Sequence, residues 1–190
     1  NKKRKFKINK KIFYKNPLKI IDKNKIDILF ECIGLSDGIS KKVVEKALKN
    51  CIHVITPNKA LISKHGDYLS NIAERKKVNL EFEASVGGGI PIIRTIKEGL
   101  STNRITKVYG ILNGTCNYLL SEMERTNDSF KNVLKKAQTL GYAEPGNPKL
   151  DINGYDTLAK VRILSSLAFK KKISRNELLM EGIENIEPKD

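Results

Sequence analysis

With 190 residues, the chain is long enough to bury one medium-sized core or two small ones. Hydrophobic residues make up 39% of it and charged residues 30%, a balance that excludes a disordered chain, and no apolar run is long enough to span a bilayer. The net charge of +15 is compatible with nucleic-acid binding, but the lysines are scattered through every segment, so we expect a solvated basic surface and keep a basic nucleic-acid-binding module as the alternative.

The first half of the chain alternates short apolar runs with amphipathic helices. The run that ends at Gly34 has the continuous apolar character of a buried parallel strand. We expect strand, helix, strand, helix and strand over residues 26–33, 39–50, 53–56, 61–76 and 78–84. This order predicts an α/β fold with one flank of a doubly wound, Rossmann-type parallel sheet.

The pattern changes after three consecutive glycines, Gly87 to Gly89, which mark a backbone that turns or comes close to a partner. Beyond them the sequence indicates a mixed α+β part with a strand over residues 104–112. Helices are expected over residues 113–123, 129–141 and 154–169, with a polar loop over 142–150.

Two lysines are candidates for proton transfer. Asp156 and Lys160 are four residues apart on one helix face, which is typical of a surface ion pair, but the apolar residues of that helix favour a partly buried lysine. Lys59 follows the second strand, at the sheet edge where doubly wound folds bind ligands, although a solvated surface lysine fits the same pattern. Glu83 stands beside glycine-rich backbone, an oxygen-rich combination that suits a hard cation.

Three cysteines, Cys32, Cys51 and Cys116, are widely spaced and odd in number. Such a set is typical of a reducing cytoplasm rather than of a disulfide framework, so we expect a cytoplasmic protein with free thiols. The basic N-terminal residues, Lys2 to Lys7, have no apolar stretch behind them, which argues against a secretory signal.

Five motifs in a fixed order make the chain resemble homoserine dehydrogenases from about residue 26 onward. They are TPNKA (56–60), EASVGGGIP (83–91), GILNGTCNY (110–118), LGYAE (140–144) and DINGYDTLAK (151–160). The resemblance implies NAD- or NADP-dependent interconversion of L-aspartate 4-semialdehyde and L-homoserine, in the biosynthesis of threonine, methionine and isoleucine. It also implies a homodimer, with no membrane and no specific nucleic-acid partner.

The resemblance assigns roles to particular residues. Lys160 matches the family's catalytic lysine, the proton donor to the carbonyl oxygen, and Lys59 matches a second lysine beside the nicotinamide. The positions that match substrate-binding residues are Glu144, Asp156, Asn113, Gly114 and Thr115. Cofactor binding is expected at Lys59, Ile33 and Gly34, and a sodium site at Glu83, Val86, Gly88 and Ile90.

By the same resemblance, residues 1–85 are the remainder of an NAD(P)-binding Rossmann domain and residues 86–190 a catalytic, substrate-binding and dimerisation domain. The family's G-x-G-x-x-G pyrophosphate turn does not occur ahead of residue 26, so we expect an internal fragment of the enzyme. A fragment without that turn is expected to bind its cofactor weakly, and a catalytically inactive chain is therefore the second reading. The loop before Asp151 holds one residue more than the family spacing, assigned to Gly146.

Overall fold

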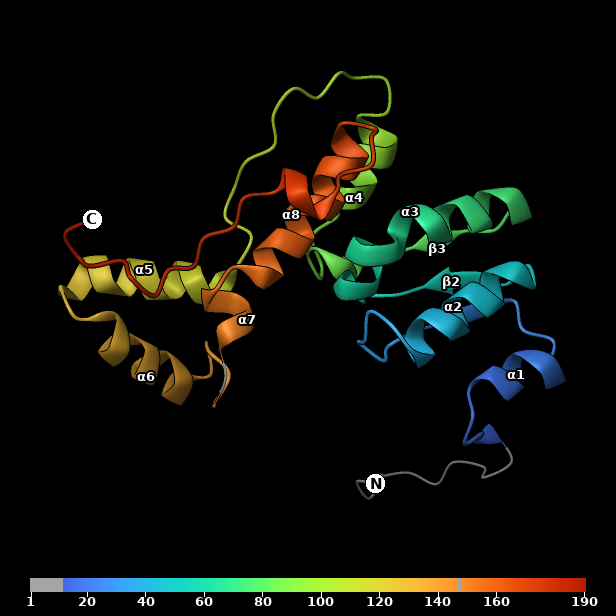
Figure 1. The fold of residues 1–190 in the computed structure, drawn as a ribbon, viewed down its shortest axis with the longest axis horizontal. Helices are drawn as coiled ribbons and strands as arrows, with labels where there is room; N and C mark the ends of the chain where they lie inside the picture. The colour runs from blue at the N-terminus through green and yellow to red at the C-terminus, as the bar shows by residue number, and fades with distance from the viewer. Residues whose placement is uncertain (1–11, 147) are drawn as a thin grey trace.

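The computed structural model of the chain describes residues 12–146 and 148–190 (Figure 1). The basic cluster from Lys2 to Lys7 lies outside the described residues. In the first half, the elements are α1 (Leu18–Lys23), β1 (Ile28–Phe30), α2 (Ile39–Lys49), β2 (His53–Ile55), α3 (Lys59–Lys76) and β3 (Leu80–Glu81). A short 3-10 turn, Glu83–Ser85, follows β3.

A three-stranded parallel sheet with the order β1-β2-β3 lies in this half, and α2 and α3 pack side by side against it (Figure 1). This confirms the α/β class and the parallel sheet. The strands are shorter than predicted, and β1 lies at the edge of the described sheet. The expectation of a fully buried first strand is wrong for Ile28 and Phe30, which are 51% and 67% exposed.

Among the described residues of the second half, all regular secondary structure is helical. Its elements are α4 (Ile92–Arg94), a π-helical turn (Thr95–Gly99), α5 (Gly114–Thr126), α6 (Phe130–Leu140), α7 (Lys149–Ile152), α8 (Tyr155–Ala168) and a 3-10 turn (Arg175–Glu177). The strand predicted over residues 104–112 is wrong. That segment forms a long loop between the π-helical turn and α5, without a strand partner among the described residues (Figure 1).

Two asparagines and one glycine set the ends of the helices as their sequence positions suggest. The side-chain oxygen of Asn58 accepts a hydrogen bond from the backbone N–H of Leu61 and caps α3. Asn113 caps α5 in the same way, through the N–H of Cys116. Gly141 ends α6 with φ +82°, a conformation that glycine adopts without strain.

Two apolar cores stabilise the chain, and α8 connects the regions that hold them. The larger core combines the sheet, α2 and α3 with Ile163, Leu164 and Ala168 from the C-terminal half of α8. The smaller core holds α5, α6 and α7 together around Leu119 and Met123. Because the start of α8 faces the smaller region and its end is buried in the larger one, this helix fixes how the two regions meet (Figure 1).

None of the described helices combines the length and apolar character that a bilayer crossing needs. The three cysteines are free thiols, as predicted.

Candidate active site

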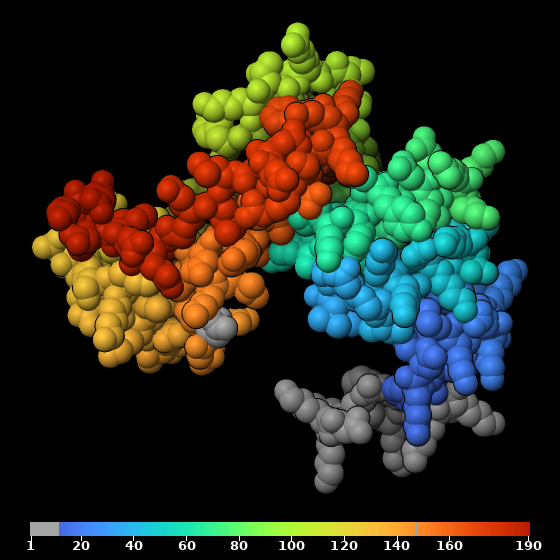
Figure 2. Space-filling view, viewed as in Figure 1, coloured from blue at the N-terminus to red at the C-terminus, as the bar shows by residue number. Residues whose placement is uncertain are grey.

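A cavity of about 390 Å³ opens between the sheet region and the helical region. In Figure 2 the surface is hollowed between the blue segment of the first half and the orange segment of the second. The residues that line the cavity are Gly34, Lys59, Ala60, Glu144, Leu150, Asp151, Tyr155, Asp156 and Ala159. Four of the predicted site residues, Gly34, Lys59, Glu144 and Asp156, therefore face one space, although Gly34 follows the first strand and the other three come from three separate motifs.

Asp156 binds both candidate lysines. Lys59, the first residue of α3, donates a hydrogen bond to Oδ1 of Asp156, 97 positions along the chain. Lys160 lies one helical turn after Asp156, and its Nζ is 2.9 Å from Oδ2. The Lys160 side chain is 15% exposed and that of Lys59 is 39% exposed. The surface-pair interpretation of Asp156 and Lys160 is thus wrong, because both side chains are largely buried, with Asp156 in the cavity wall and Lys160 behind it.

The carboxyl of Asp156 is held in its charged form. Burial opposes its ionisation, but the hydrogen bonds from the two lysines and from Asn113 outweigh burial, so the pKa of Asp156 lies below its ordinary value. Its position in the first turn of α8 acts in the same direction, because a helix N-terminus favours a negative charge. The site therefore presents two ammonium groups around one fixed carboxylate.

Asn113 joins two carboxylates at the edge of the cavity. Its Nδ2 donates to Oδ1 of Asp151 at 2.8 Å and to Oδ2 of Asp156 at 3.1 Å, while its Oδ1 caps α5. Asp151 is a site residue that the assigned roles missed. The signal for it was present, since Asp151 opens the same sequence motif that ends at Lys160.

Lys160 has a second fixed partner, the backbone carbonyl of Leu112, which accepts its Nζ at 2.7 Å. The segment before α5 thus contributes to the orientation of the lysine together with Asp156. A lysine held between a carboxylate and a carbonyl oxygen keeps its ammonium in one place, so a reacting oxygen beside it would meet a positioned proton donor.

Other predicted positions lie around the cavity or away from it. Glu144 lines the cavity despite the extra residue in its loop. Ile33, Gly114 and Thr115 do not line it, and Asn113 and Lys160 lie behind the lining, in contact with Asp156. The hydroxyl of Thr115 donates instead to the carbonyl of Tyr142 at 2.8 Å, which ties the start of α5 to the loop that carries Glu144.

The glycine-rich segment after β3 forms a helix cap. Both oxygens of Glu83 accept backbone N–H groups at the start of α4, from Ile93 at 2.7 Å and Arg94 at 2.8 Å. The carbonyl of Ile90 accepts the N–H of Ile92. Carboxylate and carbonyl oxygens have further lone pairs, so the donor set still suits a hard cation while also serving this cap.

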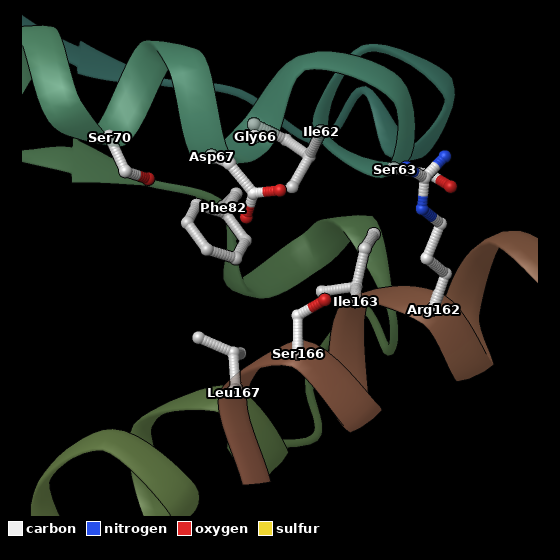
Figure 3. Close-up of a pocket in the computed structure, with 10 residues that line it drawn as sticks. All are labelled: Ile62, Ser63, Gly66, Asp67, Ser70, Phe82, Arg162, Ile163, Ser166 and Leu167. Carbon is white, nitrogen blue, oxygen red and sulfur yellow. The ribbon is translucent and has the colours of Figure 1, made fainter. Parts of the chain in front are cut away.

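A second, smaller cavity of about 60 Å³ lies between α3 and α8 (Figure 3). Its lining is Ile62, Ser63, Gly66, Asp67, Ser70, Phe82, Arg162, Ile163, Ser166 and Leu167. None of the predicted site residues is among them, and Nε of Arg162 donates to the carbonyl of Ile173. The space is far smaller than the cavity at Asp156 and is lined by two packed helices, so we interpret it as a packing gap rather than a substrate site.

Comparison with known proteins identifies the family. The model of the family described as homoserine dehydrogenase matches residues 91–190, and the model of the homoserine dehydrogenase NAD-binding domain matches residues 1–83. The chain belongs to the homoserine dehydrogenase family. The alternative that was based on the net charge, a basic nucleic-acid-binding module, is therefore not favoured.

Relatives extend the match to homoserine dehydrogenases over nearly the whole chain. It is 42% identical over 178 residues to the homoserine dehydrogenase of Neisseria gonorrhoeae, which covers 94% of this chain and 40% of that protein. The crystal structure of a homoserine dehydrogenase from Thiobacillus denitrificans superposes with a TM-score of 0.86 at 43% identity, covering 93% of this chain and 40% of that one. A hyperthermophilic archaeal homoserine dehydrogenase in complex with NADPH has a TM-score of 0.80 at 25% identity, over 90% of this chain and 52% of that one. The chain thus spans about 40% of the length of the curated relatives it matches.

Proposed function

We propose that the protein is an NAD(P)-dependent homoserine dehydrogenase that interconverts L-aspartate 4-semialdehyde and L-homoserine, a step of amino-acid biosynthesis. The observation that carries this proposal is the arrangement of Lys59 and Lys160 around Asp156, with Lys59 and Asp156 in the cavity wall. Membership of the homoserine dehydrogenase family supports it.

In the proposed reaction, the bound nicotinamide supplies or accepts the hydride. Lys160 holds the proton that the aldehyde oxygen receives from Nζ as the alcohol forms, and takes it back in the reverse direction. Lys59 places a second positive charge on the same side of the cavity, where it stabilises negative charge that develops on that oxygen. Both lysines keep their positions because each has a fixed anionic partner in Asp156.

Carboxylates at the cavity wall are assigned to the amino end of the substrate. Glu144 and Asp156 line the cavity, and Asp151 lies between them, so three acidic side chains face a substrate whose α-ammonium carries a positive charge. Asn113 bridges two of these carboxylates, Asp151 and Asp156, through its two hydrogen bonds. We assign Gly114 and Thr115 an indirect role, because they shape the start of α5 behind the cavity.

The cofactor is assigned to the end of β1. Gly34 lies at the cavity wall with φ +90°, and a Cβ at this position would meet no atom within 4 Å, so its backbone is open to a ligand that comes close. Ile33 and Lys59 would hold the cofactor with it. The NADPH named in the archaeal relative's structure supports NAD(P), and the sequence does not choose between NAD and NADP.

Four further assignments complete the proposal. Residues 1–85 act as the cofactor part and 86–190 as the catalytic and dimerisation part. A sodium ion binds at the oxygens of Glu83, Val86, Gly88 and Ile90, which suit a hard cation. The protein is a cytoplasmic homodimer, and the exposed 104–112 segment, with Tyr109 at 86% and Ile111 at 76% exposure, supplies apolar surface for a second copy.

The proposal is tested by the homoserine-dependent reduction of NAD and NADP, followed by absorbance. We expect activity in the chain and a loss of about 10²- to 10⁴-fold in kcat for Lys160→Met, the range that positioned proton donors contribute. Lys135→Met, which removes an exposed lysine of α6, is the matched control and should leave kcat unchanged. Equal activity in the two variants would contradict the role of Lys160, and no activity in the wild-type chain would favour the inactive alternative.

A further inference from the structure

Glu31 is a buried carboxylate that the proposed mechanism does not use. It follows β1 directly and is 2% exposed. Oε1 accepts hydrogen bonds from the backbone N–H of Ile33 at 2.7 Å and from the hydroxyl of Ser40 at 2.8 Å. Oε2 accepts from the hydroxyl of Thr56 at 2.6 Å and from Nδ2 of Asn58 at 3.2 Å. Four donors from three segments of the chain therefore converge on one side chain.

No lysine, arginine or histidine within the described residues forms an ion pair with Glu31. A buried charge without a cation is costly, and here hydrogen bonds alone compensate for it. Burial would raise the pKa of Glu31, but the four hydrogen bonds outweigh burial and lower it, so the group is an anion that accepts at both oxygens. Only an acceptor without N–H groups of its own satisfies these donors.

Apart from Ser40 of α2, the donors belong to two segments that lead to the cavity. On one side, Ile33 leads to Gly34, whose N–H lies 3.4 Å from the same Oε1 and which lines the cavity wall. On the other side, Thr56 and Asn58 lead to Lys59. Glu31 thus clamps the loop after β1 to the loop after β2, at the carboxyl edge of the sheet where doubly wound folds bind ligands.

The side-chain amide of Asn58 connects Glu31 to the start of α3. Its Oδ1 caps the helix at the N–H of Leu61, 3.1 Å away. Its Nδ2 donates to Glu31, to the carbonyl of Leu35 at 2.9 Å and to the hydroxyl of Ser40 at 3.0 Å. Because Lys59 is the next residue and the first of α3, its position relative to Asp156 depends on this amide.

We propose that Glu31 is a positioning residue of the active site: it fixes the start of α3 so that Lys59 reaches Asp156 from the sheet side, while holding Gly34 on the same cavity. The proposal rests on the proposed function for its meaning, but the contact it controls, between Lys59 and Asp156, is measurable without any turnover.

The test is the pKa of the Asp156 carboxyl, measured by NMR in the wild type and in Glu31→Gln. The charged groups that face Asp156 are Lys59 and Lys160, with Asp151 held alongside through Asn113. If Glu31 positions Lys59, the variant loosens one ammonium partner of Asp156, and the pKa of Asp156 rises by about 1. If the only effect of the variant were the loss of the negative charge at position 31, the pKa of Asp156 would fall, because removing a nearby anion makes a carboxyl easier to ionise. The direction of the shift therefore separates positioning from simple electrostatics.

Two further variants sharpen the test. Glu45→Gln removes a carboxylate of α2 that binds Lys49 and Tyr68 away from the cavity, so the pKa of Asp156 should not change. Thr56→Val keeps the shape of the side chain but removes one donor to Glu31 and also the hydroxyl that accepts the N–H of Asn58. Both bonds belong to the cluster around Glu31, so the variant should give a smaller rise, and it decides the question if Glu31→Gln does not fold.

An unchanged or lowered pKa of Asp156 in folded Glu31→Gln, or in Thr56→Val if the first variant does not fold, overturns the proposal. Failure of the proposed function is read separately, as absent homoserine-dependent reduction in the wild type, and does not alter this measurement.

Discussion

The two walls of the cavity are stabilised by different interactions, hydrogen bonds on the sheet side and ion pairs on the helical side. On the sheet side, Glu31, Ser40, Thr56 and Asn58 form a hydrogen-bonded cluster in which each residue is 5% exposed or less. On the helical side, the polar groups are charged and half-buried, and they meet at Asp156. A buried neutral network with one anion is rigid, whereas ion pairs beside a cavity can exchange partners with a charged ligand. The sheet side thus sets positions, and the helical side is suited to chemistry.

The variant Asp156→Asn should disrupt the ion pairs of the helical side and have the largest effect on activity. It leaves two ammonium groups without their shared anion, so we expect kcat/KM for homoserine to fall about 100-fold, in line with the loss of one partner of a buried charge pair. Steady-state assays measure this change. Asp67→Asn on α3 removes an exposed aspartate and should leave kcat/KM unaltered; similar losses in both variants would mean that overall charge, not position, matters.

Core substitutions test whether the two regions are stable independently. Leu69 lies in the larger core and Leu119 in the smaller, and both are fully buried. Truncation of either to alanine should lower the free energy of unfolding by about 2–5 kcal/mol. Urea unfolding followed by circular dichroism measures it, with Leu179→Ala, at a 92% exposed position, expected to change it by less than about 0.5 kcal/mol.

Because α8 enters the larger core and begins beside the smaller one, both leucine variants should still unfold in a single transition. Two separate transitions in Leu119→Ala would show that the helical region unfolds alone and that α8 does not couple the cores.

The smallest effect concerns a surface contact of the helical region. Glu122 of α5 binds Arg125 and also Lys136 of α6, and these hydrogen bonds lower the pKa of Glu122 to about 2. A carboxyl whose pKa is lower in the folded state stabilises the fold above its unfolded value of about 4.3 and loses this contribution as the pH falls toward 2. In Glu122→Gln, the free energy of unfolding should fall less steeply between pH 4.3 and pH 2. Identical slopes would contradict the contact.

The sequence predicted the parts of the fold that depend on local patterns. Apolar periodicity located α2, α3 and α8, and the caps at Asn58 and Asn113 follow from the preference of asparagine for helix starts. The strand over residues 104–112 was wrong, because alternating apolar residues need a partner strand and the described chain offers none. Strand lengths also depend on pairing, and only Ile28–Phe30 of the expected first strand has a partner register with β2.

For the site, the motifs named candidate residues but not their contacts. Nothing local to Lys59 indicates that it binds Asp156, since that contact depends on α3 packing against α8. The role of Glu31 was equally invisible, because an apolar run ending in a carboxylate does not reveal which donors fold onto it.

The claim that one site is assembled from both regions is tested most directly by a double-mutant cycle between Lys59→Met and Asp156→Asn. The free energy of unfolding of the wild type, the two single variants and the double variant gives the coupling energy of the pair. Direct contact predicts a coupling of about 0.5–3 kcal/mol. Additive effects, within about 0.3–0.5 kcal/mol, would show that the two side chains do not meet and would contradict the account.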